Sequence, residues 1–98
     1  MIITYRNKRI ERICTIAKEA EKLYGKIMAE KIHQRIDELT AADTVEMLIR
    51  FHIGRCHRLV QNRKGQFAMD LIHPYRLVFE QRGEEIQIAH ILEIVDYH

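Results

Sequence analysis

Ninety-eight residues leave room for a single domain, residues 1–98, with one modest hydrophobic core. The composition is 47% hydrophobic and 31% charged, with four Gly and one Pro, which excludes a disordered or collagen-like chain. The formal charge is +2, no apolar run is long enough to span a membrane, and charged residues stand where a signal peptide needs apolar ones. Cys14 and Cys56 lie far apart without Cys-x-x-Cys spacing, which argues against a disulfide scaffold and a zinc site. We therefore expect a cytoplasmic protein without membrane contact.

The first half of the chain shows one short strand followed by helices. Residues 2–5 are β-branched or aromatic and predict a strand. From Asn7 to Tyr24 apolar residues recur every three or four positions, which predicts one amphipathic helix that Asn7 caps and Gly25 ends. A second helix with the same period follows to Leu39, so Gly25 is expected to be the hinge of a helical hairpin. Residues 41–50 predict a short third helix, with a capping box from Asp43 to Glu46.

After Gly54 the pattern changes to strands. Residues 56–61 and 66–72 predict two strands around a turn, and in the second Phe67, Met69 and Leu71 alternate with Gln66, Ala68 and Asp70. His73-Pro74 marks the next turn, residues 75–81 predict another strand, and Gly83 marks a tight reversal. The last strand is expected to place Ile86, Ile88, His90, Leu92 and Ile94 on one apolar face, with His90 a hydrogen-bonded core residue. The order β-α-α-β-β-β-β predicts an α+β fold, an antiparallel sheet with its helices packed on one side.

The charge is distributed unevenly along the chain. Residues 50–79 carry six Lys/Arg and a single acid, Asp70, whereas residues 80–98 carry one Lys/Arg and five Asp/Glu. Five of the six positive residues are arginines, whose planar guanidinium suits bidentate contact with phosphate. This basic block favours a polyanion partner. The alternative is a solvated sheet face next to the acidic last strand.

Common catalytic motifs are absent from the sequence. It contains no glycine-rich phosphate loop, no Gly-x-Ser-x-Gly and no His-Glu-x-x-His. Cys56 lies between Arg55 and His57, neighbours that lower a thiol pKa, yet adjacent strand residues point to opposite faces. We therefore do not favour a catalytic Cys56, and without paired histidine spacing we expect no bound metal.

The chain ends in three polar residues directly after a buried strand. Asp96, Tyr97 and His98 together offer a proton-transfer group active near neutral pH and a ring on which a base can stack. The alternative is a frayed tail.

Several motifs, in order along nearly the whole chain, resemble one family. These are Gly-x-Cys-His at 54–57, Asn-Arg-Lys-Gly-Gln at 62–66, His-Pro-Tyr-Arg at 73–76 and the terminal Asp-Tyr-His, together with the opening IITYRNKRIERIC. They resemble the HigB toxins, also called plasmid maintenance system killer proteins, of the RelE-like toxin superfamily. The resemblance implies a RelE-like fold and an mRNA interferase, a toxin that cuts mRNA in the ribosomal A site without a metal or other cofactor. It also implies a HigA-like helix-turn-helix antitoxin as partner, and operator DNA bound only through the toxin–antitoxin complex.

The resemblance also implies roles for particular residues. Metal-free RNA cleavage needs a base for the 2′-hydroxyl proton, an acid for the leaving 5′-oxygen and cations for the charge on the phosphorane. His57 and His98 are the proton-transfer candidates, in either order, and Arg76 the electrostatic stabiliser. Asp96 would orient an imidazole or contact a base edge, and Tyr97 would orient or stack the nucleotide. The expected contacts to RNA phosphate or rRNA come from Arg55, Arg58, Arg63, Lys64 and His73, the last of which has a purely structural role as its alternative.

One position departs from the family pattern. Where the family has a catalytic Lys three residues after the histidine, this chain has Val60. Arg58, on the same strand face, or Lys64 would have to replace that cation. The possibilities are an active toxin with rearranged cations, an attenuated toxin, or a non-catalytic binding module that acts with an antitoxin as a repressor. A metal-dependent nuclease that uses several histidines is a weaker alternative.

Overall fold

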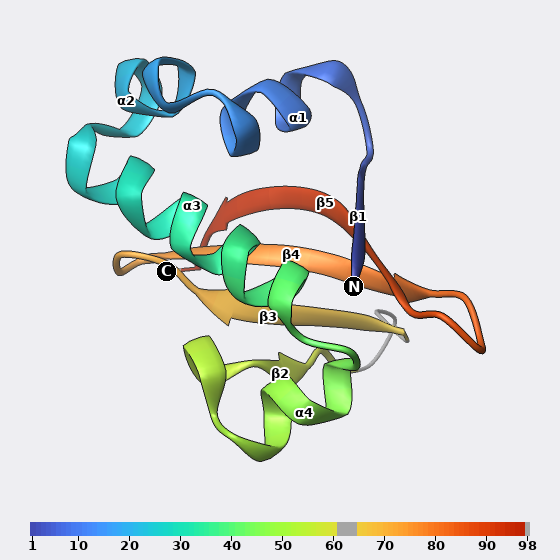
Figure 1. Ribbon diagram of the computed structural model, residues 1–98. Helices are drawn as coiled ribbons and strands as arrows, with labels where there is room; N and C mark the ends of the chain where they lie inside the picture. Colours follow the sequence, from blue (N-terminus) through green and yellow to red (C-terminus); the bar gives the residue numbers. More distant parts are fainter. Residues whose placement is uncertain (61–64, 98) are drawn as a thin grey trace.

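A five-stranded sheet with helices on one side forms the core of the computed structural model, which describes residues 1–60 and 65–97 (Figure 1). In chain order the elements are β1 (Ile2–Tyr5), α1 (Lys8–Thr15), α2 (Ala17–Tyr24), α3 (Lys26–Ala41), α4 (Val45–Arg50), a 3-10 turn (Ile53–Arg55), β2 (His57–Arg58), β3 (Gln66–Asp70), β4 (Tyr75–Arg82) and β5 (Ile88–Asp96). The α+β prediction is confirmed. Within residues 1–60 and 65–97, no helix combines the length and apolar character that a membrane span requires.

The strand order is β1-β5-β4-β3-β2. Three neighbouring pairs are antiparallel, whereas β1 runs parallel to β5, so the sheet is mixed rather than purely antiparallel as expected. The reason is topological, because the four helices that follow β1 carry the chain across the sheet before the antiparallel strands begin. β5, the last strand, consequently lies between β1 and β4 (Figure 1).

The helices follow the predicted apolar period with one interruption. Asn7 caps α1 by accepting a hydrogen bond from the backbone N–H of Ile10 at 2.9 Å, as predicted. The helix expected to continue to Tyr24 breaks at Ile16, whose backbone is extended. Thr15 donates its hydroxyl to the carbonyl of Glu11 at 2.7 Å, and such back-bonding by a β-branched residue weakens a helix. Gly25, with φ 86°, joins α2 to α3 as the predicted hinge.

The cap of α4 differs from the prediction. Thr44, not Asp43, is the capping residue, and its hydroxyl accepts from the N–H of Met47 at 3.2 Å. Glu46 instead accepts a hydrogen bond from the side chain of Gln87 at 3.0 Å, and Gln87 also accepts from the N–H of Val45. The predicted capping box therefore does not form, because a residue from the distant β4–β5 connection engages its glutamate.

The strands confirm one predicted face and correct another. In β3, Phe67, Met69 and the following Leu71 enter the core as expected. In β5 the buried residues are Ala89 and Ile91, so the expected face is wrong from Ile86 to Leu92, whereas Ile94 packs against the core as expected. The register explains the change: Val78 pairs with Glu93 and Phe79 with Ile91, so Leu92 is an extra residue beyond which the alternation is reversed.

Two further local predictions concern His90 and Gly83. His90 is half-buried, its Nδ1 is hydrogen-bonded to the hydroxyl of Thr4 at 2.7 Å, and burial lowers its pKa, so the expected hydrogen bond is present. Gly83 has φ 81°, and a Cβ there would lie 2.3 Å from the carbonyl oxygen of Ile86, which confirms the tight reversal. β2 is shorter than the predicted strand at 56–61 and has only two residues.

Candidate nucleic-acid interface

Arg55 is positioned by a turn with unusual backbone geometry. Between α4 and β2, Gly54 has φ 58° and Arg55 has φ 52°, both in the left-handed region. A side chain at position 54 is excluded, since its Cβ would lie 2.7 Å from Nε of Arg35. Non-glycine residues rarely adopt this conformation. From this turn the Arg55 side chain reaches Asp70, with which it forms an ion pair.

Asp70, at the end of β3, holds two arginines. Arg55 donates two hydrogen bonds to its carboxylate, from Nε to Oδ2 at 2.6 Å and from Nη2 to Oδ1 at 3.0 Å. Arg76, opposite Asp70 in the β3–β4 register, places Nε 3.5 Å from Oδ1. The hydrogen bond from Arg55 is the main reason that the pKa of Asp70 is lowered, while the charges of Arg76 and His57 act in the same direction. We call Arg55, Asp70 and Arg76 the arginine clamp.

A buried arginine fixes the backbone below the clamp. Arg35 of α3 is buried, donates from Nε to the carbonyl of Asp70 at 2.6 Å and pairs with Glu38 at 2.8 Å. The end of β3 is therefore tied to α3 through a charge-assisted hydrogen bond. The position of Asp70 thus depends on a helix on the other side of the sheet.

Tyr97 completes this end of the sheet. The guanidinium of Arg76 lies 4.6 Å from the centre of the Tyr97 ring, a cation–π contact, and the backbone N–H of Tyr97 donates to the carbonyl of Pro74 at 3.0 Å. A cavity of about 80 Å³ opens beside them. Its lining includes the three clamp residues, His73 and Tyr97. The sheet end thus combines two cations, a ring and a small recess.

His57 approaches the clamp from β2. It pairs with Ala68, which lies two residues before Asp70 on the same face of β3. Its Nδ1 lies 2.9 Å from the carbonyl oxygen of Arg55. A carbonyl oxygen only accepts, so Nδ1 carries the proton and Nε2 is the acceptor of the neutral ring. This tautomer suits a proton-accepting role.

Two expected site residues lie elsewhere. Arg58 pairs with Phe67 and places its guanidinium 5.2 Å from that ring, so it faces the side of the sheet opposite to His57. It does not join the clamp. Asp96 ends β5 opposite Tyr75, one residue before Tyr97. Arg63, Lys64 and His98 lie outside the described residues.

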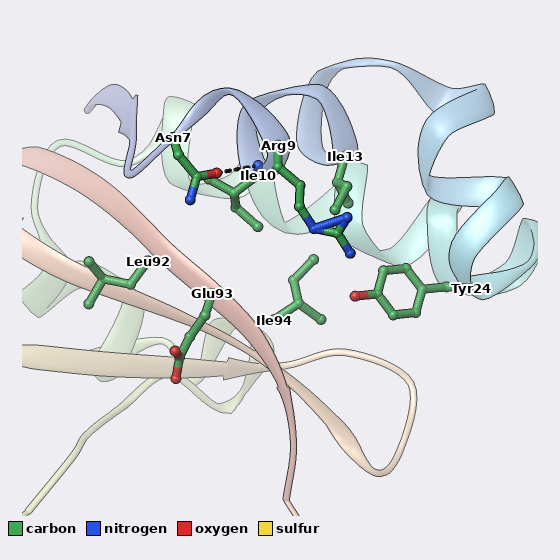
Figure 2. A pocket seen from close by; sticks show the side chains of 8 residues that line it. All are labelled: Asn7, Arg9, Ile10, Ile13, Tyr24, Leu92, Glu93 and Ile94. Carbon is green, nitrogen blue, oxygen red and sulfur yellow. Dashed lines mark hydrogen bonds between the residues drawn. The ribbon is translucent and has the colours of Figure 1, made fainter.

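A second cavity, of about 180 Å³, lies between α1, α2 and β5 (Figure 2). Ile10 and Ile13 line it on the helix side and Ile94 on the strand side, while Arg9 and Tyr24 point toward one another at its rim (Figure 2). Among the described residues that line it, none is a histidine or a cysteine. The cavity lacks the convergent cations of the clamp, which is therefore the stronger candidate for a functional site.

Neither a thiolate nor a metal centre emerges from the described residues. Burial raises the pKa of the Cys56 thiol to about 12, and the same holds for Cys14. A thiol with so high a pKa is a poor nucleophile near neutral pH. Within residues 1–60 and 65–97, no group of three His, Cys, Asp or Glu side chains is arranged to hold a metal ion.

Two residues of the site escaped the sequence analysis as functional candidates. Asp70 was noted only as the single acid of the basic block, which was the available signal that a carboxylate organises the arginines. Arg35 lies within the second predicted helix, between the apolar residues Ile32 and Leu39. A charged residue at an apolar position was the signal there, because a buried guanidinium needs a partner.

No protein-family model and no curated protein sequence matches the chain. Among solved structures, it is similar to a YoeB/ParE toxin from Agrobacterium tumefaciens, with 14% sequence identity, a TM-score of 0.69 and full coverage of both chains. The chain therefore shares its fold with this YoeB/ParE toxin. At this identity the similarity establishes the fold, and the function has to be argued from the site.

Proposed function

We propose that the protein is the toxin of a type II toxin–antitoxin system and an endoribonuclease that cuts mRNA in the ribosomal A site without a metal, which stops translation. The carrying observation is the convergence of Arg55, Arg76, His57 and Tyr97 at one end of the sheet. The toxin-type fold supports the proposal. A HigA-like helix-turn-helix antitoxin would hold the chain inactive, and operator DNA would bind only the complex of the two.

The proposed reaction is attack of an RNA 2′-oxygen on the adjacent phosphorus, with loss of the 5′-oxygen. Nε2 of His57 would take the 2′-hydroxyl proton, since its Nδ1 proton is bonded to Arg55. Arg76 and Arg55 would stabilise the phosphorane, and one such preorganised donor contributes about 3 to 4 kcal/mol. Tyr97 would stack on a base. His98 remains the proposed proton donor to the leaving oxygen.

A second candidate is a non-catalytic binding module that docks an antitoxin. Val60, where the family has a cationic residue, favours it, because its side chain is 74% exposed and brings no charge. The binding of Arg55 by Asp70 also favours it, since a neutralised arginine stabilises an incoming phosphate less.

Translation of a reporter mRNA with purified ribosomes separates these two functions. Primer extension is expected to reveal cuts within A-site codons with the wild-type chain. Arg76→Ala should reduce the cutting rate by about 100-fold or more. Arg82→Ala, at the other end of β4 and paired with Glu80, is the matched control and should retain activity.

Growth assays provide a second test that separates the nuclease from the binding module. Induction without antitoxin should arrest growth for the wild type and for Arg82→Ala, but not for Arg76→Ala or His57→Gln. An intact message together with normal growth under wild-type induction would reject the nuclease and leave the binding module.

A further inference from the structure

In the arginine clamp, the guanidinium of Arg55 binds the Asp70 carboxylate in the way that it would bind a phosphate. Arg55 meets the two oxygens of Asp70 with Nε and Nη2, at 2.6 and 3.0 Å. This two-pronged contact is the same for a carboxylate and for a phosphate. The Asp70 carboxylate thus occupies the donors that a phosphodiester would use.

The clamp is open to exchange. The side chains of Arg55, Asp70 and Arg76 are 59%, 34% and 29% exposed. Ion pairs with this much solvent contact contribute little net stability. An incoming phosphate can therefore replace the carboxylate, provided that other contacts compensate for the repulsion between two anions.

The carboxylate cannot leave the site by a backbone movement. Arg35 holds the carbonyl of Asp70, and the N–H of Leu71 donates to the carbonyl of Tyr75 at 3.0 Å. Asp70 also sits opposite Arg76 in a regular strand pairing. Any exchange is thus limited to side-chain rotation, and the displaced carboxylate stays close to the bound phosphate.

We propose that Asp70 is a specificity-determining residue that competes with RNA phosphate for Arg55 and Arg76. RNA held only by its phosphates is rejected, and RNA that is positioned by further contacts is accepted. This deepens the proposed function, on which it rests, since it explains how a basic surface avoids the bulk of cellular RNA. Asp70 need not touch the reacting atoms for this role.

Binding of a short 2′-O-methylated single-stranded RNA, which cannot be cleaved, tests the proposal. Fluorescence anisotropy should show that Asp70→Asn binds about tenfold or more tightly than the wild type, because a juxtaposed like charge has been removed. Asp37→Asn changes the net charge equally on the exposed side of α3 and is the matched control, with a change below about twofold expected. Equal affinity of the two variants, or weaker binding by Asp70→Asn, overturns the proposal.

A double-mutant cycle tests the same competition from the arginine side. Arg55→Gln should have little effect on RNA affinity in the wild-type background, where the carboxylate engages Arg55. In the Asp70→Asn background it should remove most of the gain. Additive effects of the two substitutions would contradict the competition.

The wild-type protein provides a further check that does not depend on whether a variant folds. During titration with the 2′-O-methylated RNA, whose bases offer contacts besides the phosphates, the NMR signals of the Arg55 Nε–H and the Asp70 carboxyl carbon should move together. Movement of the Arg55 signal alone would refute the displacement. The ribosome assay is separate: if the wild type does not cut mRNA but Asp70→Asn binds RNA more tightly, the proposed function fails and the competition stands.

Discussion

The Asp70 carboxylate makes the stability of the fold depend on pH. Its pKa lies below the ordinary value of 3.8, chiefly through the hydrogen bond from Arg55. A lowered pKa in the folded state contributes stability that is fully present above that ordinary value and is lost as the pH falls through the folded-state pKa. The arginine clamp therefore contributes near neutral pH and not in strong acid.

Urea unfolding of the wild type and Asp70→Asn checks this dependence. At about pH 6 the wild type should be the more stable, and the difference should shrink as the pH falls below the ordinary carboxyl pKa of 3.8. A constant difference between wild type and Asp70→Asn over this range would contradict the assignment.

Cysteine reactivity gives a second prediction for single residues. Because burial raises the pKa of both Cys14 and Cys56 to about 12, alkylation by iodoacetamide at about pH 8 should be slow in the native protein and fast in urea. Mass spectrometry of timed samples measures both rates. Rapid native labelling of Cys56 would show that its thiol is accessible and would reopen its catalytic role.

For single residues, the sequence predicts which segment is basic better than it predicts which charged side chains contact one another. The number and type of the basic residues predict an anion partner for the block at 50–79, and two of its arginines, Arg55 and Arg76, lie together at the sheet end. Arg58 belongs to the same basic block but faces Phe67, because its neighbour His57 takes the other side of β2. The central role of Asp70 depends on the β3–β4 register, which residue composition does not contain.

The assignment of Thr44 as the N-terminal cap of α4 can be tested by substitution. Thr44→Ala should lower the free energy of unfolding by about 1 kcal/mol, since the N–H of Met47 loses its acceptor. Asp43→Ala should change it by less than about 0.5 kcal/mol, as for a surface substitution away from a cap. Thermal or urea unfolding of both variants measures the contrast. The reverse order would restore Asp43 as the cap.

Arg35 tests the link between α3 and β3. Arg35→Met keeps the apolar stem but leaves the Asp70 carbonyl unpaired and removes the partner of Glu38, and should cost about 2 to 3 kcal/mol. Gln34→Met, the exposed neighbour on the same helix, is the control and should be nearly neutral. Urea unfolding measures both. Equal stability of the two variants would remove Arg35 from the support of the arginine clamp.

Elements are predictable where the local pattern is strong and tertiary contacts only reinforce it. The Gly25 hinge and the inward face of β3 are of this kind. The break at Ile16 has no glycine or proline to announce it, and the extra residue at Leu92 is visible only in the pairing with β4. At the start of α4, Gln87, which is distant in sequence, accepts from the N–H of Val45 and donates to Glu46.

The whole sheet depends on its last strand. β5 pairs with both β1 and β4, so without it β1 has no partner among the described strands. The short segment at 2–5 does not indicate whether its strand pairs in parallel or antiparallel. The sequence therefore predicted a sheet with helices on one side but not the parallel pairing of β1 with β5. The order of the strands is a property of the complete chain.

A chain that stops at residue 85, before β5, should not fold. Far-UV circular dichroism and urea titration should show little structure and no cooperative transition, because the hydrophobic face of the helices then lacks Ala89 and Ile91. The full chain is the control. A cooperative transition in the shortened chain would show that the remaining strands form a stable sheet alone.

A ribosome releases the segment 88–96 after all the other strands, although it belongs between two of them. Arg76 and the ring of Tyr97 can therefore meet only after residue 97 has left the exit tunnel. Synthesis that is interrupted before residue 97 yields fragments in which this pair never forms. The contact between Arg76 and Tyr97 therefore forms late in synthesis, after β1 to β4 have been made.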